Sequence, residues 1–163
     1  MEIQVALDQG YLPEKFARLA TARLSGQPIV SFPIQLAKLP KQTQALAITL
    51  IDYDAVPRTG FPFIHWLAVD LPVMTEITTD FSRHYTGAQG RNSWVSRFYD
   101  VDEVLTTGFA GPNPPDKPHR YTLTVYALKQ VTGLATGFFY NDLRDALVSK
   151  VLDQATVVIP VKN

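Results

Sequence analysis

The sequence contains no cysteine and no excess of charge of either sign. Without cysteine, the chain has no disulfide, no thiolate metal ligand and no cysteine nucleophile. Its 15 basic residues equal its 15 acidic residues, so no overall positive field attracts nucleic acid or an anionic membrane surface. Any binding site for an anion must therefore be local.

Long apolar runs and targeting signals are lacking as well. No run approaches the ~18 apolar residues of a membrane span, so we expect no integral membrane association. The first residues include the acidic Glu2 and show no basic region followed by an apolar segment, so we expect no signal peptide and a cytoplasmic protein. Nothing repeats along the 163 residues, and we predict a single domain over residues 1–163 with one sizeable core.

What the sequence does contain is a set of apolar, β-branched segments bounded by turn-forming residues. Such segments are typical of β-strands. The principal strands are predicted at residues 44–51, 63–71 and 121–128, and shorter strands at 3–7, 29–36 and 156–161.

Helices are predicted at two places. Leu143, Ala146, Leu147 and Val151 recur at helical spacing, and Asn141 or Asp142 can cap the start of that helix. A second short helix is predicted around residues 13–24, with Pro13 in its first turn. Residues 75–107 carry single aromatic rings in a polar context and are expected to form a long, ordered excursion. The predicted fold is therefore mainly β, with long loops and a C-terminal helix followed by a final strand.

Strand alternation places three polar residues on apolar faces. Asp52 continues the series of alternate apolar residues in the first principal strand, and His119 is in phase with those of the third. His65 is in phase with Phe63, Leu67, Val69 and Leu71 of the second strand, which puts Trp66 on the opposite face. Each polar residue lies near a strand end. Two interpretations stay open at this point: three separately hydrogen-bonded core residues, or one shared pocket.

The segment before His119 is unusually rich in proline. Four of the 12 prolines, at positions 112, 114, 115 and 118, precede the strand that begins near His119. Proline restricts φ and removes a backbone donor, so this segment is predicted to be a stiff, extended surface loop. A stiff loop beside a strand can hold one polar side chain in a defined position.

Three motifs occur in a familiar order: DYDAVP at 52–57, IHWLAV at 64–69, and GPNPP at 111–115 followed by HRY at 119–121. Together they resemble the phosphatidylethanolamine-binding protein family, and most closely its bacterial branch of Raf kinase inhibitor-like proteins. The resemblance runs from about residue 31 to residue 161. It implies a β-sandwich of two packed, mostly antiparallel sheets, with a small pocket at one end that takes phosphate, phosphoryl head groups or acetate.

The resemblance also implies which residues form that pocket. The ligand-binding set would be Asp52, His65, Gly111, Pro112 and His119, supported by Asp54, Phe63, Phe109 and Arg120. Two departures from the family pattern are present: one residue is inserted before Pro57, and Phe109 stands where the family usually has tyrosine. Asp54 and Arg120 are expected to pair with each other and brace two loops. No cofactor and no metal are expected.

The leading functional prediction is a non-enzymatic binding module for a small anionic or phosphorylated ligand. Asp52 is expected to push a neighbouring histidine towards its charged form, and the Gly111 amide to point at the oxyanion. A regulatory role towards kinases or proteases is a further implication of the resemblance.

Two other classes of function stay open. In a hydrolase of a small ester or phosphoester, histidine and aspartate would act as acid–base partners, with Ser93 as a nucleophile rather than a turn serine. A metal site formed by Asp52, His65 and His119 is a further alternative, with less support than the hydrolase. In an interaction module, Trp66 and Trp94 would form a surface for a protein partner or a homodimer. His84 is predicted to be an ordinary surface residue.

Overall fold

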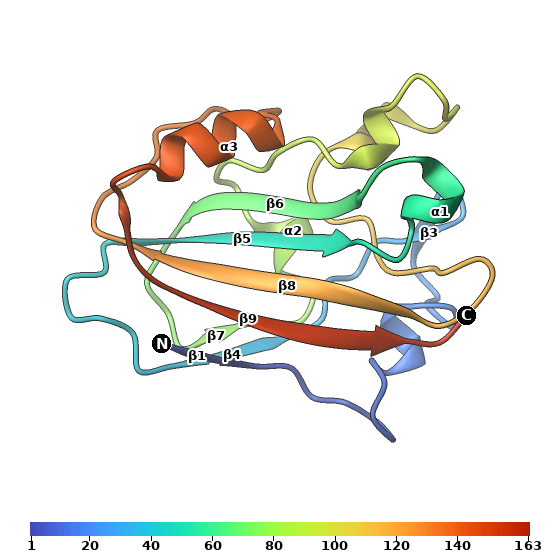
Figure 1. Cartoon of the computed structure of the whole chain (residues 1–163), viewed down its shortest axis with the longest axis horizontal. Coiled ribbons are helices and arrows are strands. Elements are labelled where there is room, and N and C mark those ends of the chain that lie inside the picture. The colour runs from blue at the N-terminus through green and yellow to red at the C-terminus, as the bar shows by residue number, and fades with distance from the viewer.

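Two antiparallel sheets face each other in the computed structural model, which describes residues 1–163 (Figure 1). The larger sheet has the strand order β6-β5-β8-β9, and the smaller has the order β1-β4-β7. The large sheet consists of β5 (Ala45–Asp52), β6 (Phe63–Leu71), β8 (His119–Leu128) and β9 (Val151–Val161). The small sheet consists of β1 (Glu2–Gln4), β4 (Ile34–Ala37) and β7 (Glu76–Ile77), and β2 (Arg23–Leu24) pairs with β3 (Gln27–Pro28). This β-sandwich confirms the predicted fold class.

The helices are short and lie outside the sheets. They are α1 (Val56–Thr59), α2 (Phe81–His84) and α3 (Tyr140–Leu147), with 3₁₀ turns at Glu14–Phe16, Ser93–Val95 and Glu103–Thr106. None of the helices is long and apolar enough to cross a membrane.

The core is built on β5, all of whose residues are buried. Alternate residues such as Ile48 face the small sheet, where they pack in one cluster with Ile34 and Ile77. The residues between them, such as Ala47, face the other way and pack in a second cluster with Leu143 of α3. A strand covered on both faces needs a continuous apolar sequence, which is what residues 45–51 supply.

Two irregularities in β6 change the faces predicted for its side chains. Leu50 pairs with Trp66 while Ile51 pairs with Ile64, so His65 is an extra residue at a β-bulge. As a result Trp66 faces the main core, where it is fully buried and its Nε1 donates to the side-chain oxygen of Gln89 at 2.9 Å. The predictions that Trp66 lies on an outer face and that it forms part of a partner surface are therefore wrong.

The three principal strands are confirmed, but several smaller predictions are not. The final strand starts at Val151, so this residue does not belong to the C-terminal helix. The helix predicted at 13–24 is reduced to the turn Glu14–Phe16, because Arg23 already pairs with Pro28 in a small hairpin. The strand predicted at 29–36 is interrupted before β4, where Pro33 lacks a backbone donor.

The segment 75–107 is ordered, as predicted, and is attached to the sandwich by hydrogen bonds. The Gly90 amide donates to the Leu67 carbonyl at 2.9 Å, and the buried Asn92 side-chain amide donates to the carbonyls of Leu105 and Gly108 at 2.7 and 3.1 Å. These contacts bring the 3₁₀ turn at Ser93–Val95 to the end of the large sheet.

That end of the large sheet collects the polar residues of the motifs. Because β5 is antiparallel to both β6 and β8, the end of β5 meets the beginnings of β6 and β8. Asp52 pairs with Phe63 on one side and Tyr121 on the other. The same end carries α1 and the turn of the proline-rich loop, opposite the end over which α3 lies (Figure 1).

Candidate functional site

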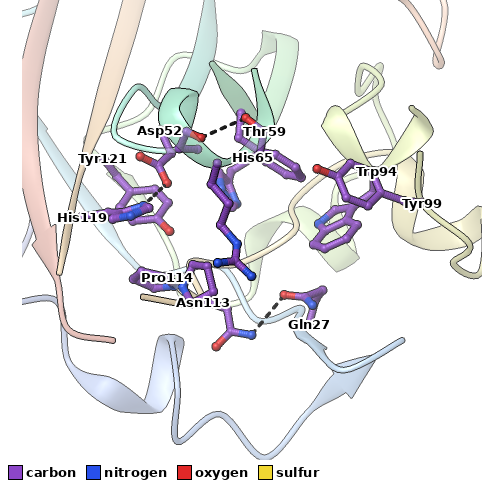
Figure 2. A pocket seen from close by; sticks show the side chains of 14 residues that line it. Gln27, Asp52, Thr59, His65, Trp94, Tyr99, Asn113, Pro114, His119 and Tyr121 are labelled. Carbon is purple, nitrogen blue, oxygen red and sulfur yellow. Dashed lines mark hydrogen bonds and ion pairs between the residues drawn. The ribbon is translucent and has the colours of Figure 1, made fainter. Parts of the chain in front are cut away.

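A cavity of about 300 Å³ opens at this end of the sandwich. Asp52, His119 and Tyr121 lie on one side of it, and Trp94 and Tyr99 lie on the other (Figure 2). Three of the predicted ligand-binding residues, Asp52, His65 and His119, are brought together here, and Phe63 supports them. The lining residues are Gln27, Asp52, Ala55, Arg58, Thr59, Phe63, His65, Trp94, Tyr99, Asn113, Pro114, Pro115, His119 and Tyr121.

His119 is held between two carboxylates. Its Nδ1 lies 2.7 Å from Asp52 Oδ2, and its Nε2 lies 3.0 Å from Asp116 Oδ1. A neutral imidazole has only one N–H, so the ring can donate both hydrogen bonds only in its doubly protonated form. Burial would raise the pKa of Asp116, but the hydrogen bond and positive charge of His119 lower it by more. His119 is 1% exposed, so its orientation is determined by these contacts.

Asp52 is buried, and only one of its two carboxylate oxygens has a hydrogen-bond partner. Its Oδ2 accepts from His119, whereas its Oδ1 is buried and has no hydrogen-bond partner. The hydroxyl of Tyr121 lies near this carboxylate but forms no hydrogen bond of normal length with it. Burial, followed by the negative charge of Asp52, raises the pKa of Tyr121 well above its usual value. The tyrosine is therefore a neutral hydroxyl at physiological pH.

His65 differs from His119 in both partner and charge. Its Nδ1 lies 2.7 Å from the Ala110 carbonyl, and the ring packs between Phe63 and Tyr121 with centroid distances of 4.9 Å to each. Burial lowers the pKa of His65 from 6.5 to about 4, although the bond to Ala110 and the charge of Asp52 oppose this. The ring is thus neutral at pH 7, with Nδ1 as the donor and Nε2 as an acceptor. The charge of Asp52 therefore does not make His65 positive, because desolvation exceeds the effect of the carboxylate; the histidine that Asp52 contacts directly is His119.

Aromatic side chains form the opposite wall. Trp94 packs edge-on against Phe63 and Tyr99, with centroid distances of 5.2 and 4.8 Å. Trp94 comes from the 3₁₀ turn, whose start is capped by Asn92: the Trp94 amide donates to Asn92 Oδ1 at 3.0 Å. The long excursion therefore completes the cavity.

Arg58 brings the one guanidinium group among the lining residues. It lies on α1, a single turn that begins at Val56, has Pro57 in its first turn and is followed by Gly60, whose φ of 84° is left-handed. Arg58 is exposed and takes part in no ion pair of the protein. Its charge is therefore available to a ligand.

The proline-rich loop forms the floor of the opening, but not as predicted. Pro114, Pro115 and Asn113 line the cavity, and the Asn113 side-chain amide donates to the Gln27 side-chain oxygen at 3.3 Å (Figure 2). Gly111 and Pro112 are absent from the lining. The Gly111 amide donates to the Pro28 carbonyl at 2.7 Å, so it is not a free donor that could point at an oxyanion.

The remaining supporting residues lie outside the cavity. Arg120 donates to Asp54 from its backbone amide at 2.9 Å and from its guanidinium at 3.1 Å, the expected pairing. The side-chain hydrogen bond from Arg120 lowers the pKa of Asp54. Phe109 is buried against Phe32 and Trp66 in the main core and does not line the cavity.

The alternative sites receive no geometric support. Ser93 is not part of the cavity lining, and its Oγ accepts a hydrogen bond from the Ile64 amide at 2.8 Å, as a structural serine does. No group of three or more His, Asp or Glu side chains is arranged to hold a metal ion. The side chain of His84 is 76% exposed, as predicted.

Sequence analysis missed Arg58, Trp94, Tyr99, Asn113 and Tyr121 as lining residues. Two of them left a detectable signal. Tyr121 shares the strand phase of His119, and Arg58 lies in the connector between two strands whose facing ends carry Asp52 and His65. For Trp94 and Tyr99 the sequence offers no comparable pattern, because their position depends on how the excursion folds back.

Comparisons with known proteins agree with this architecture. The family profile described as phosphatidylethanolamine-binding protein matches residues 2–162. The chain is 37% identical over 153 residues to the uncharacterized protein YxkA of Bacillus subtilis, covering 90% of this chain and 91% of that protein. Escherichia coli YbcL, whose structure is described as that of a member of the mammalian PEBP family, superposes with a TM-score of 0.75 at 24% identity, covering 99% and 98% of the two chains. A putative phosphatidylethanolamine-binding protein homologue of Chlamydia trachomatis gives a TM-score of 0.76 at 22% identity, covering 94% and 90%.

Proposed function

Because the chain belongs to the phosphatidylethanolamine-binding protein family, we propose that its cavity binds a small anionic or phosphorylated group without transforming it chemically. The observation that carries this proposal is the unpaired guanidinium of Arg58 at the rim of a preformed cavity with two buried histidines. Guanidinium groups present several N–H donors in a plane that matches the oxygens of phosphate and carboxylate groups.

The size and the lining of the cavity support a small ligand. A volume of about 300 Å³ is at the lower end of the range for small-molecule pockets. Apolar rings cover one wall and polar groups converge on the other, which is the usual composition of a site that orients a ligand through a few hydrogen bonds. In this arrangement Arg58 attracts the anion, and the buried polar groups determine its orientation.

Binding is favoured over hydrolysis because the cavity lacks an activated nucleophile. The one hydroxyl of a serine or threonine in the lining belongs to Thr59, whose Oγ1 bonds the carbonyls of Ala55 and Phe61 at 3.0 and 2.6 Å. A hydroxyl that donates to backbone carbonyls is not activated by a base. A regulatory role towards a kinase or protease remains a prediction from the family resemblance.

The proposal is tested by titrating methyl phosphate into the protein while the imidazole NMR signals of His65, His119 and His84 are followed. We expect the first two to shift together and the exposed His84 to stay unchanged. Arg58→Gln should weaken binding by about 10-fold or more, since a hydrogen bond to a charged group contributes roughly 1.5–3 kcal/mol.

Arg144→Gln is the matched control, because it removes the same charge from an exposed position on α3. Equal affinity in the protein, Arg58→Gln and Arg144→Gln would refute the role of Arg58. Absence of any shift at His65 and His119 would refute the anion pocket itself.

A further inference from the structure

The inner end of the cavity offers hydrogen-bond acceptors rather than donors, and this has a consequence for the ligand. We propose that the site selects an oxyanion that carries its own proton, such as a phosphomonoester monoanion, and rejects an oxyanion of equal charge without an O–H group, such as a sulfate monoester. This inference rests on the proposed function and names the ligand class of the same cavity.

The first acceptor is Oδ1 of Asp52. The residue is 3% exposed and lines the cavity, yet this oxygen has no hydrogen-bond partner. Leaving a buried carboxylate oxygen unpaired costs about 1–3 kcal/mol or more. A ligand O–H group would satisfy it, whereas a ligand oxygen without a proton would be repelled by it.

The second acceptor is Nε2 of His65. A hydrogen bond of 2.7 Å joins Nδ1 to the Ala110 carbonyl, and this geometry assigns the proton to Nδ1 and a lone pair to Nε2. Burial lowers the pKa of His65 to about 4, which keeps the ring in this form throughout the neutral range. His65 and Asp52 therefore do not supply the N–H groups that a fully deprotonated anion needs.

The charges around the cavity point the same way. Arg58 on α1 faces two carboxylates, Asp52 on β5 and Asp116 on the proline-rich loop, which hold the His119 ring between them. Just outside, Asp54 and Arg120 neutralise each other. Tyr121, whose pKa is raised by burial, carries a neutral hydroxyl. With no net positive charge, the site suits a singly charged ligand better than a dianion.

Tyr121 is the one neighbouring donor that could compete with the ligand for Asp52. Its hydroxyl lies near the carboxylate without a hydrogen bond of normal length. If the Tyr121 hydroxyl turned to donate to Asp52 Oδ1, that oxygen would no longer be free to accept a hydrogen bond from a ligand. Tyr121→Phe removes this competitor, so it should preserve or increase the preference for a protonated ligand.

The decisive experiment compares methyl phosphate with methyl sulfate by calorimetry at pH 5.5 and pH 8 at constant ionic strength. At pH 5.5 methyl phosphate is mostly a monoanion, since the second pKa of a phosphomonoester is about 6. It then has the same charge and nearly the same shape as methyl sulfate, with one additional O–H. We expect it to bind at least ~10-fold more tightly than methyl sulfate.

Raising the pH to 8 removes the ligand proton, and we expect the affinity for methyl phosphate to fall by roughly 10- to 100-fold. Asp52→Asn places an amide where the carboxylate lies, and it should reduce the preference over methyl sulfate to less than ~3-fold. Because this variant also weakens the charged contact with His119 and could fail to fold, His65→Leu, which removes the second acceptor, provides an independent test of the same loss of preference.

The outcomes separate this inference from the proposed function. If both ligands bind with equal affinity at pH 5.5, the proton requirement is refuted and the anion pocket stands. If neither ligand binds, both proposals fail. If methyl phosphate binds more tightly at pH 8 than at pH 5.5, the site prefers the dianion and the inference is overturned.

Discussion

Protonation of His65 should control how the stability of the protein depends on pH. In the unfolded chain the imidazole has its ordinary pKa of 6.5, whereas burial in the folded protein lowers the pKa to about 4. Between these two values the unfolded state binds a proton that the folded state does not. Acidification through this window therefore favours unfolding, and the free energy of unfolding rises with pH.

The magnitude follows from the two pKa values. Each pH unit between them contributes about 1.4 kcal/mol, so the step from pH 7 to pH 5 should lower the free energy of unfolding by about 2 kcal/mol through His65 alone. Over the whole window the loss approaches ~3 kcal/mol. Other acidic groups also titrate, so the contribution has to be isolated with a variant.

The variant His65→Gln isolates the contribution of His65 to the free energy of unfolding, because glutamine retains an N–H group for the Ala110 carbonyl and does not titrate. Urea unfolding of both proteins at pH 7 and pH 5 would be measured in a buffer without phosphate. We expect the difference in free energy of unfolding between the two proteins to change by about 2 kcal/mol in favour of the variant at pH 5. A difference that stays constant within ~0.5 kcal/mol would show that His65 is not buried in its neutral form.

Two further predictions test the packing of the chain. Gly111→Ala should lower the free energy of unfolding by about 1–3 kcal/mol, because its Cβ would lie 2.7 Å from the Cβ of Pro28; unchanged urea unfolding would contradict this close approach. Trp66→Ala should lower the free energy of unfolding by about 3–5 kcal/mol, since the ring is fully buried. Phe98→Ala, at a residue that is 70% exposed, should change it by less than ~0.5 kcal/mol. Similar losses for the two variants would contradict the assigned face of Trp66.

The principal strands and the central polar trio could be predicted from local sequence. Apolar, β-branched runs identify β5 and β8, and Asp52 and His119 continue the alternate positions that face the main core. Antiparallel pairing then places the end of β5 beside the beginnings of β6 and β8, which brings His65 to the same edge. Periodicity and chain direction are local properties, and they are visible in one sequence.

The faces of β6 and the charges of the site depend on tertiary structure. The bulge at His65 reverses the expected face of Trp66, whose ring packs in the core between the sheets. The neutral form of His65 results from desolvation to which residues distant in the sequence, such as Tyr121, contribute. Strand alternation contains no information about either, since both depend on packing between segments that only the folded chain brings together.

The donors and acceptors of the cavity were decided in the same way. The sequence predicts that the Gly111 amide donates a hydrogen bond to an anion, but in the folded chain this amide donates to the Pro28 carbonyl. Arg58 is one of several basic residues in the sequence, but it becomes a ligand-binding candidate because α1 places it at the cavity without a carboxylate partner. The residue types present in the pocket were thus determined by the sequence, whereas which of their polar atoms remain free for a ligand was determined by long-range hydrogen bonds and burial, which exist only after folding.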